Sequence, residues 1–336
     1  MYKQIVRPAL FAFDPEKIHN RMVNALGIYA KSCLLRPFVK AIYGSKPASV
    51  NVAGLRLKGH IGLSAGFDKE AKAFRAMPDF GFSFVEIGTA TPSPLKGNTS
   101  PRLFRMEKCD SLIGRTGFNN PGLDVIEQRL RQKEEGTVVG VNINKNPKTT
   151  GTENIVADFM ALVERLYGKA DYFTINWGSI SPDEMDAVLG AIAEFEKGKT
   201  LKRPVFVKLP ADVPEAGIDQ MLDIATKRGA AGAVATGPTQ QRDGLAKAYT
   251  QSELEAIGAG AVSGKAMTNK SERVVKYLRS HAPKGFAIIG SGGIMTPTDA
   301  KRITEAGADL IEIYSAFVFE GPSIASKMEA AIQGKR

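Results

Sequence analysis

Residues 286–317 read FAIIGSGGIMTPTDAKRITEAGADLIEIYSAF, and this stretch indicates the fold of the whole chain. The apolar run at 286–289 shows no polar alternation, which is typical of a strand buried on both faces in a parallel sheet. A glycine turn, a helical segment and a second glycine turn separate it from another apolar strand at 310–314. The stretch therefore predicts a β-α-β unit.

Both strands of this unit end in residues suited to an anion. The first ends in Gly290-Ser291-Gly292-Gly293, where the absence of Cβ atoms lets backbone N–H groups close around a ligand. The second ends in Tyr314-Ser315. Two ordinary βα turns would also explain the pattern, but neighbouring ends of this kind form the phosphate site late in (β/α)8 barrels.

The rest of the chain repeats the same alternation of strand and helix. A small hairpin is predicted at 50–57, where it would close the bottom of a barrel. Eight buried-type strand runs follow, at 60–64, 83–88, 138–143, 172–176, 204–209, 232–236, 286–290 and 309–314. Eight such alternations predict an α/β protein of the (β/α)8 TIM-barrel class, with its active site at the carboxyl ends of the strands.

Composition narrows the class of protein further. The chain has 336 residues, 43% of them hydrophobic, which suits one large barrel. No run approaches the roughly 18 apolar residues of a membrane span, and no signal peptide is visible. Cys33 and Cys109 lack metal-ligand spacing, which argues against zinc and disulfides. The net charge of +10 suits anionic lipid or a phosphorylated cofactor.

Residues 1–45 are predicted to form a helical pair outside the barrel, and residues 46–336 the barrel itself. Asp14-Pro15 is a helix start, and an apolar face follows it. That face comprises Ile18, Met22, Leu26, Tyr29 and Cys33. The pair either packs on the barrel or also touches a bilayer surface.

The polar residues at the predicted strand ends suggest a bound cofactor. Lys69, Lys208 and several amide side chains converge there, without a histidine, cysteine or carboxylate cluster. This composition argues against a metal site, a Ser-His-Asp triad and a pair of glycosidase carboxylates. Amides can bind the N–H and C=O groups of a planar ring, and a lysine can stabilise negative charge on it.

These segments together carry a resemblance to a known family. They are SAGFDK (64–69), EIGTATPSPLKGN with PRLFR (86–105), GFNNPG (117–122), VNINKN (141–146), VKL (207–209), VSGK (262–265), IIGSGGI (288–294) and IYSAFVFEGP (313–322). In order and spacing the chain resembles dihydroorotate dehydrogenase of the quinone-using, membrane-associated class. The resemblance covers nearly the whole length.

The resemblance implies an FMN cofactor and a place for each part of the site. The residues implied to bind FMN are Ala65, Gly66, Thr89, Asn142, Asn176, Lys208, Thr236, Gly264, Gly292, Gly293, Tyr314 and Ser315. Those implied for the substrate are Lys69, Arg115, Gly117, Phe118 and Asn176, and for quinone His19, Arg105 and Tyr314. Ser179 matches the catalytic base of the class, with Ser181 as the alternative.

The implied reaction oxidises (S)-dihydroorotate to orotate in pyrimidine biosynthesis and passes the electrons to quinone. The implied partners are a small-molecule substrate, quinone and a membrane surface bound through residues 1–45, with no nucleic acid. The implied location is the cytoplasm, at the inner face of a membrane.

The chain departs from the family where the substrate ring is bound. Gly114, Ser181 and the pair Gly237-Pro238 stand where the family has side chains, mostly asparagine, that contact the pyrimidine. A site without such groups binds a ligand that needs them far more weakly. The same flavin chemistry on another cyclic or unsaturated substrate is therefore an alternative, and a catalytically silent FMN-binding protein is a second one. A tRNA dihydrouridine reductase would need a further helical domain after the barrel.

Overall fold

The computed structural model describes residues 2–45 and 47–334, and a closed barrel of eight parallel strands lies at its centre. The strands are β3 (Ile61–Leu63), β4 (Phe84–Ala90), β7 (Val138–Ile143), β8 (Tyr172–Asn176), β9 (Val205–Leu209), β10 (Gly232–Ala235), β12 (Ala287–Ser291) and β13 (Leu310–Ile313). All eight predicted runs are barrel strands, so the predicted fold class is confirmed. The first strand, β3, pairs with the last, β13, and this pairing closes the barrel.

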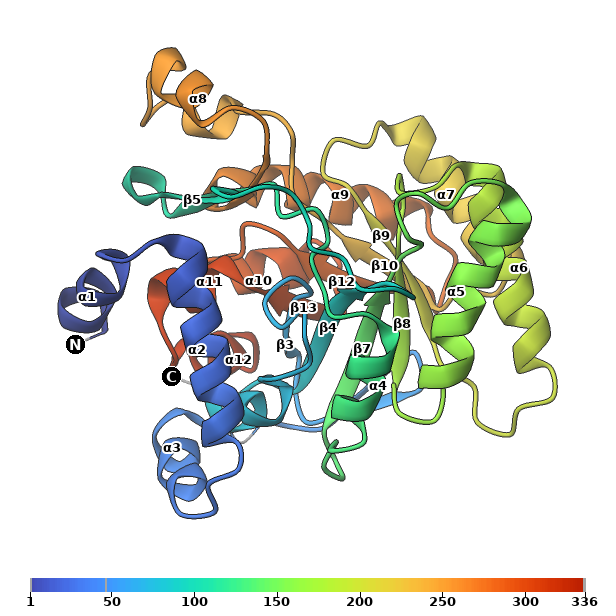
Figure 1. The fold of residues 1–336 in the computed structure, drawn as a ribbon, viewed down its shortest axis with the longest axis horizontal. Helices are drawn as coiled ribbons and strands as arrows, with labels where there is room; N and C mark the ends of the chain where they lie inside the picture. The colour runs from blue at the N-terminus through green and yellow to red at the C-terminus, as the bar shows by residue number, and fades with distance from the viewer. Residues whose placement is uncertain (1, 46, 335–336) are drawn as a thin grey trace.

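Helices surround the barrel on its outer face (Figure 1). They are α4 (Leu123–Leu130), α5 (Thr152–Leu166), α6 (Pro182–Glu196), α7 (Glu215–Lys227), α9 (Thr268–His281), α10 (Pro297–Glu305), α11 (Ser315–Glu320) and α12 (Ile324–Ile332). Helix α8 (Gln251–Ile257) lies apart from the barrel (Figure 1), and its Leu254 packs with Met106, Ile113 and Val262. Most of the surrounding helices present an apolar stripe to the strands; in α5, for example, Ile155, Phe159 and Leu162 are buried. Strands covered on both faces need apolar residues at every position, which explains why their sequences do not alternate.

The predicted hairpin closes the bottom of the barrel. Its strands are β1 (Val50–Val52) and β2 (Leu55–Leu57), paired antiparallel. Leu57 is buried in one apolar cluster with Phe84, Tyr172 and Phe206 from three barrel strands. This cluster fills the end of the barrel opposite the carboxyl ends of the strands, so that a ligand can enter from one side only.

A second, outer sheet, which the sequence did not reveal, lies over the carboxyl ends of the barrel strands. It consists of β5 (Leu103–Met106), β6 (Ser111–Gly114) and β11 (Ala261–Gly264), in the antiparallel order β11-β6-β5. Strands β5 and β6 are neighbours in sequence, whereas β11 joins them from far along the chain, as the pairing of Val262 with Ile113 shows. A strand whose partner is so distant leaves no local signal.

The N-terminal helices pack against one side of the barrel, near α11 and α12 (Figure 1). Helix α2 (Pro15–Tyr29) begins as predicted, because the Asp14 carboxylate accepts a hydrogen bond from the Lys17 N–H at 2.8 Å. Helix α3 (Leu35–Tyr43) follows it. A π-helical turn (Tyr2–Val6) and α1 (Arg7–Phe11) precede them, and neither was predicted.

The apolar face predicted for α2 is only partly correct. Leu26 is buried, but its buried companions are Val23 and Ala30, which join the main core of the barrel, while Cys33 is exposed. Met22 is half exposed. The buried stripe is therefore rotated, because the neighbouring elements and not the helix decide which side is covered. The predicted boundary between residues 45 and 46 falls beside Lys46, which lies outside the described residues, and the two-domain division stays a prediction.

Candidate active site

All twelve residues expected to bind the cofactor line one cavity at the carboxyl ends of the barrel strands. The cavity has a volume of about 300 Å³. Its walls come from all eight barrel strands or the turns that follow them, and β5, β6 and β11 add to them. Residues from far apart in the chain meet here because parallel strands present their carboxyl ends at the same edge of a barrel.

One end of the cavity is lined by backbone rather than side chains. Gly292 and Gly293 have φ angles of +93° and +73°, a region that L-residues with side chains rarely adopt. A Cβ atom on Gly293 would lie 2.3 Å from the backbone nitrogen of Thr268. Buried Ser315 completes this end at the start of α11. Bare backbone amides and a hydroxyl form a surface that fits a phosphate group.

The inner wall carries a network of amide groups. Asn176 Nδ2 donates to Asn142 Oδ1 at 2.9 Å, and Thr89 Oγ1 donates to the same oxygen at 2.7 Å. These bonds hold the two side-chain amides side by side at the ends of β7 and β8. Such an arrangement presents both donors and acceptors to a planar, hydrogen-bonding ring.

A buried charged cluster lies at the bottom of the cavity, where the sequence predicted no carboxylate cluster. Lys208 Nζ lies 3.5 Å from Glu86 Oε1 and 3.6 Å from Glu312 Oε2. All three side chains are buried. The prediction was wrong here because strands β4, β9 and β13 are far apart in sequence, and only closure of the barrel turns their side chains towards one another.

The cluster keeps the lysine charged. Burial alone lowers the pKa of Lys208, but the carboxyl groups of Glu86 and Glu312 outweigh burial and raise it. The Lys208 ammonium also lies 3.4 Å from the Ser64 hydroxyl oxygen. A permanent positive charge therefore stands at the cavity floor, where it can stabilise negative charge on a bound ring.

The outer part of the cavity contains a second lysine. Lys69 Nζ donates to Asn119 Oδ1 at 3.0 Å, and both residues line the cavity with Phe118. Burial lowers the pKa of Lys69 to about 8, against the opposing effect of the Glu16 carboxylate. A half-desolvated ammonium of this kind is a binding group for a substrate anion.

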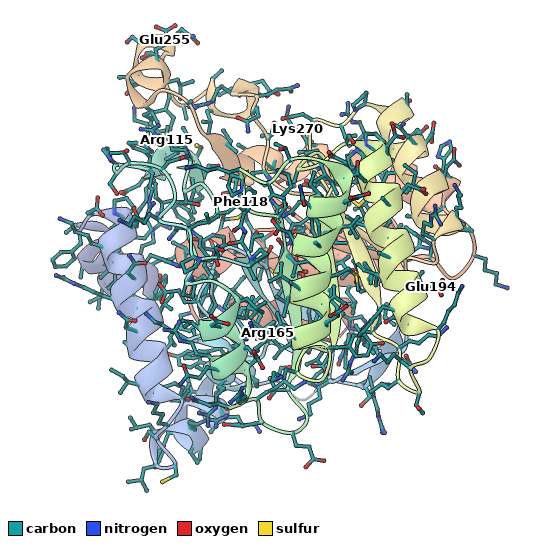
Figure 2. The ribbon with its side chains drawn as sticks, turned by 45° about the vertical axis from the view of Figure 1, so that its right-hand side comes forward. Arg115, Phe118, Arg165, Glu194, Glu255 and Lys270 are labelled. Atoms are coloured by element: carbon teal, nitrogen blue, oxygen red, sulfur yellow. The ribbon has the colours of Figure 1, made fainter. Side chains whose placement is uncertain are left out.

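Two of the residues expected at the substrate lie elsewhere. The Arg115 guanidinium donates to the carbonyl oxygens of Ile257 and Ala259, both at 2.6 Å, and stacks on Phe104. Figure 2 shows Arg115 below the helix that carries Glu255, at the outer sheet. Gly117, with φ +67°, faces Asn98. Both residues therefore shape the outer sheet and its loop rather than the cavity wall.

The two candidate base serines are also outside this cavity. Ser179 lines a separate surface depression with Lys145 and Thr149. Ser181 caps α6: its hydroxyl accepts from the Glu184 N–H at 3.3 Å within a capping box. The capping role occupies Ser181, and Ser179 remains the candidate base as a prediction.

A second, more apolar cavity of about 700 Å³ lies between the N-terminal helices and the barrel. All three residues expected at the quinone, His19, Arg105 and Tyr314, line it. The two cavities share a wall, formed by His19, Phe67, Leu103, Leu112 and Tyr314. An apolar ligand in the second cavity would therefore lie one side-chain layer from the ligand in the first.

Hydrogen bonds fix the polar residues of this wall. His19 Nε2 lies 2.9 Å from the Phe67 carbonyl oxygen and must donate to it, because a carbonyl can only accept. Burial, together with the charge of Lys69, lowers the pKa of His19 to about 4. Arg105 donates to the carbonyl oxygens of Phe11 and Phe13 at 2.7 and 2.9 Å, so the outer sheet holds the N-terminal segment.

Sequence reasoning missed several residues that line the first cavity, among them the polar residues Glu16, Asn119 and Glu312. Asn119 follows Phe118 directly and could have been found from that neighbour. Nothing in the sequence pointed to Glu16, because it belongs to the N-terminal segment and not to a strand end. Its side chain pairs with Arg102 at 2.6 Å and thereby reaches the cavity. Among residues 2–45 and 47–334, no group of three or more His, Cys, Asp or Glu residues is arranged to hold a metal ion.

Comparison with known proteins gives one consistent result. Residues 48–335 match the family model described as "Dihydroorotate dehydrogenase". The chain is 34% identical to "Dihydroorotate dehydrogenase (quinone)" of Christiangramia forsetii, with 100% of this chain and 99% of the relative covered. It is 36% identical to the protein of that name from Polaromonas naphthalenivorans, with 99% and 98% covered. The solved structure of DHODH from Eimeria tenella in complex with ferulenol superposes with a TM-score of 0.81 at 29% identity, covering 97% and 94% of the two chains.

The neutral state of His19 predicts a pH dependence of stability. Its pKa is about 4 in the folded protein and about 6.5 when unfolded, so the unfolded chain binds the proton first as pH falls. The contribution of neutral His19 to the free energy of unfolding is complete above pH 6.5 and is lost as the pH falls towards 4. We expect wild type to lose about 2–3 kcal/mol more than His19→Gln between pH 7.5 and 4.5, measured by urea unfolding. Equal losses in the two proteins would contradict a buried, neutral His19.

Proposed function

The chain belongs to the dihydroorotate dehydrogenase family, and on this premise we propose that it oxidises (S)-dihydroorotate to orotate in pyrimidine biosynthesis, with quinone as the electron acceptor. One observation carries the proposal. The twelve residues expected to bind the cofactor line a single cavity, and this cavity shares a wall with the apolar cavity beneath the N-terminal helices.

We propose FMN as the cofactor, since the family implies a flavin and the cavity fits one with a phosphate. Gly292, Gly293 and Ser315 would hold the phosphate, and the amides of Asn142 and Asn176 would bind the ring. A flavin held there would supply the hydride acceptor for the substrate and a carrier of electrons to quinone. Lys208 would favour that chemistry by keeping a positive charge at the cavity floor.

Lys69 and Asn119 support a substrate that carries a carboxylate. The Lys69 ammonium faces the outer part of the cavity and donates to Asn119 Oδ1. Phe118, with 40% of its surface exposed, lines the same part of the wall and would cover a bound ring. These groups would place the substrate between the outer sheet and the cofactor ring.

Ser179 is proposed as the base that accepts a proton from the substrate carbon next to the one that loses the hydride. Its backbone N–H donates to the Asn176 carbonyl at 3.4 Å, so the serine is tied to the end of β8, where Asn176 lines the cavity. The segment from Trp177 to Ser179 would have to turn the hydroxyl from its surface depression into the cavity for this step.

The second cavity is proposed to receive the quinone. Its walls are largely apolar, and His19, Arg105 and Tyr314 supply polar groups. A quinone combines an apolar ring with two carbonyl acceptors, and the apolar walls match the ring. The Arg105 guanidinium and the Tyr314 hydroxyl would donate to the carbonyls, because the Nε2–H of His19 is bound to the Phe67 carbonyl.

The outer surface of the N-terminal helices supports docking to a membrane at its cytoplasmic face. Leu34, Phe38 and Ile42 are 76%, 71% and 69% exposed, and Lys31 and Lys40 flank them. Apolar side chains beside basic ones suit the surface of an anionic bilayer. No helix among the described residues is long and apolar enough to cross a bilayer.

A second substrate remains a candidate because of three positions in the cavity wall. Gly114, Gly237 and Pro238 line the cavity but offer no side-chain hydrogen-bonding group. Buried amides at such positions would bind the polar edges of a pyrimidine, and their absence favours a less polar ring. The candidate is the same hydride chemistry on another cyclic or unsaturated substrate that retains a carboxylate for Lys69.

Flavin reduction distinguishes the two substrates. We expect the purified protein to contain FMN and to lose the visible absorbance of oxidised flavin when dihydroorotate is added without oxygen, with quinone restoring it. Flavin that dithionite reduces but dihydroorotate does not would contradict dihydroorotate as the substrate and favour the alternative. A protein that binds no flavin under any condition would contradict both.

Replacing Ser179 tests the base. We expect Ser179→Ala to slow flavin reduction by the substrate by about 10²–10⁴-fold, the usual contribution of a general base, with the flavin content unchanged. Stopped-flow absorbance measures the rate. Ser181→Ala is the matched control: it should destabilise α6 by about 1 kcal/mol through loss of the cap and leave the rate near that of wild type. An unchanged rate in Ser179→Ala would rule this residue out.

The membrane proposal is tested by flotation with vesicles of phosphatidylethanolamine and phosphatidylglycerol. We expect the double variant Phe38→Ser, Ile42→Ser to bind at least about 100-fold more weakly, because two apolar side chains no longer enter the bilayer. Leu201→Ser is the control: this leucine is 61% exposed and lies in the segment between α6 and β9, outside the N-terminal helices. Equal binding by wild type and the double variant would refute this docking surface.

A further inference from the structure

Glu312 is a buried carboxyl group that the proposed reaction does not use. It lies on β13, only 1% of the residue is exposed, and it lines the cofactor cavity from below. Its Oε2 atom is buried and has no hydrogen-bond partner among the described residues. An unpaired buried oxygen is costly, so its presence beside a ligand cavity requires an explanation.

Three titratable groups face Glu312 from the strands around it. Lys208 on β9 lies 3.6 Å from Oε2, and the Tyr172 hydroxyl on β8 donates to Oε1 at 3.4 Å. Glu86 on β4 interacts with both Lys208 and Glu312. The remaining polar neighbour, the Ser64 hydroxyl after β3, carries no charge. The cluster therefore holds two carboxyl groups and one ammonium.

Charge balance decides how many of these groups are ionised. Two carboxylates opposite one ammonium would leave a net negative charge among side chains that are almost fully buried, and burying an unpaired charge is strongly unfavourable. One carboxyl group must therefore hold a proton, as in other pairs of buried carboxyls that share a site.

The hydrogen bonds indicate which carboxyl holds the proton. Glu86 accepts from Thr174 Oγ1 at 2.6 Å and from Asn142 Nδ2 at 3.3 Å, and donors of this kind stabilise an ionised carboxylate. Glu312 has an oxygen without such a donor. Burial, with the nearby charge of Glu86, raises the pKa of Glu312 to about 8, in agreement with this assignment.

We propose that Glu312 is a positioning residue that stays protonated in the resting protein, so that only one carboxylate, that of Glu86, opposes the Lys208 charge beneath the ligand. This inference rests on the proposed flavin. With Glu312 neutral, the cluster has no net charge, so negative charge that develops on a bound ring meets Lys208 without a second opposing carboxylate. Ionisation of Glu312 would add that opposing charge.

The proton on Glu312 makes the reduction potential of a bound flavin depend on pH. Above pH 8 the resting protein loses the Glu312 proton, and negative charge in the cavity favours its return. Reduction would then take up one proton more than it does at lower pH. For a two-electron couple each proton contributes about 30 mV per pH unit. The potential should therefore fall more steeply with pH above 8 than below.

The decisive experiment measures the reduction potential of the flavin-loaded protein from pH 6.5 to 9.5, with a chemical reductant and a reference dye. We expect the slope to steepen by up to about 30 mV per pH unit above pH 8 in wild type and not in Glu312→Gln. Glu329→Gln is the matched control, since Glu329 is equally buried but pairs with His60 away from the cavity. It should behave as wild type. Identical slopes in wild type and Glu312→Gln would overturn the proposal.

A second measurement needs neither substrate nor cofactor. Infrared spectra of the protein without ligand should show the C=O stretch of a protonated carboxylic acid at pH 6.5. This band should be absent from the spectrum of Glu312→Gln, so it should appear in the difference between the two spectra. In wild type the band should fade as the pH rises through 8. A spectrum that Glu312→Gln leaves unchanged would refute the protonated state. Failure of dihydroorotate to reduce the flavin affects neither result, so the two proposals fail separately.

Discussion

Pairing of the first barrel strand with the last is the constraint on which the site depends. β3 and β13 align Gly62 with Glu312 and Leu63 with Ile313, which closes the sheet on itself. The residues that follow β3, including Phe67, thereby lie beside those that follow β13, including Tyr314. The apolar cluster beneath the barrel, around Tyr172, leaves one open end, so every polar side chain that faces inward near the top contributes to one cavity.

The interior of this barrel is unusual in holding three ionisable side chains in contact at one level. Their burial is unfavourable unless each charge is compensated, and Lys208 compensates only one of the two carboxyl groups. Such a cluster contributes little to stability but places a fixed charge in a site of low dielectric, where its effect on a ligand is largest. The arrangement of charge and hydrogen bonds thus serves the ligand rather than the fold.

The N-terminal segment does more than cover the barrel. Glu16 pairs with Arg102 and lines the first cavity, while His19 lies in the wall between the first cavity and the second. Arg105 holds the carbonyls of Phe11 and Phe13, so the outer sheet and the helices form one continuous structure. The segment that lines the apolar cavity is therefore also part of the wall around the proposed flavin. A substitution in the shared wall will change both cavities.

The sequence by itself determined the eight strands, the hairpin and the start of α2, because local periodicity and capping can be read along the chain. The cap at Ser181 is equally local, since the segment from Ser181 to Glu184 carries the capping-box pattern. The twelve residues that line the first cavity were implied by the resemblance to a known family, whose motifs place them at the strand ends. Only the tertiary structure decided that Glu312 meets Lys208, that Arg115 holds a loop and which side of α2 is buried. Each of these depends on a partner distant in sequence, and such a partner leaves no periodic signal.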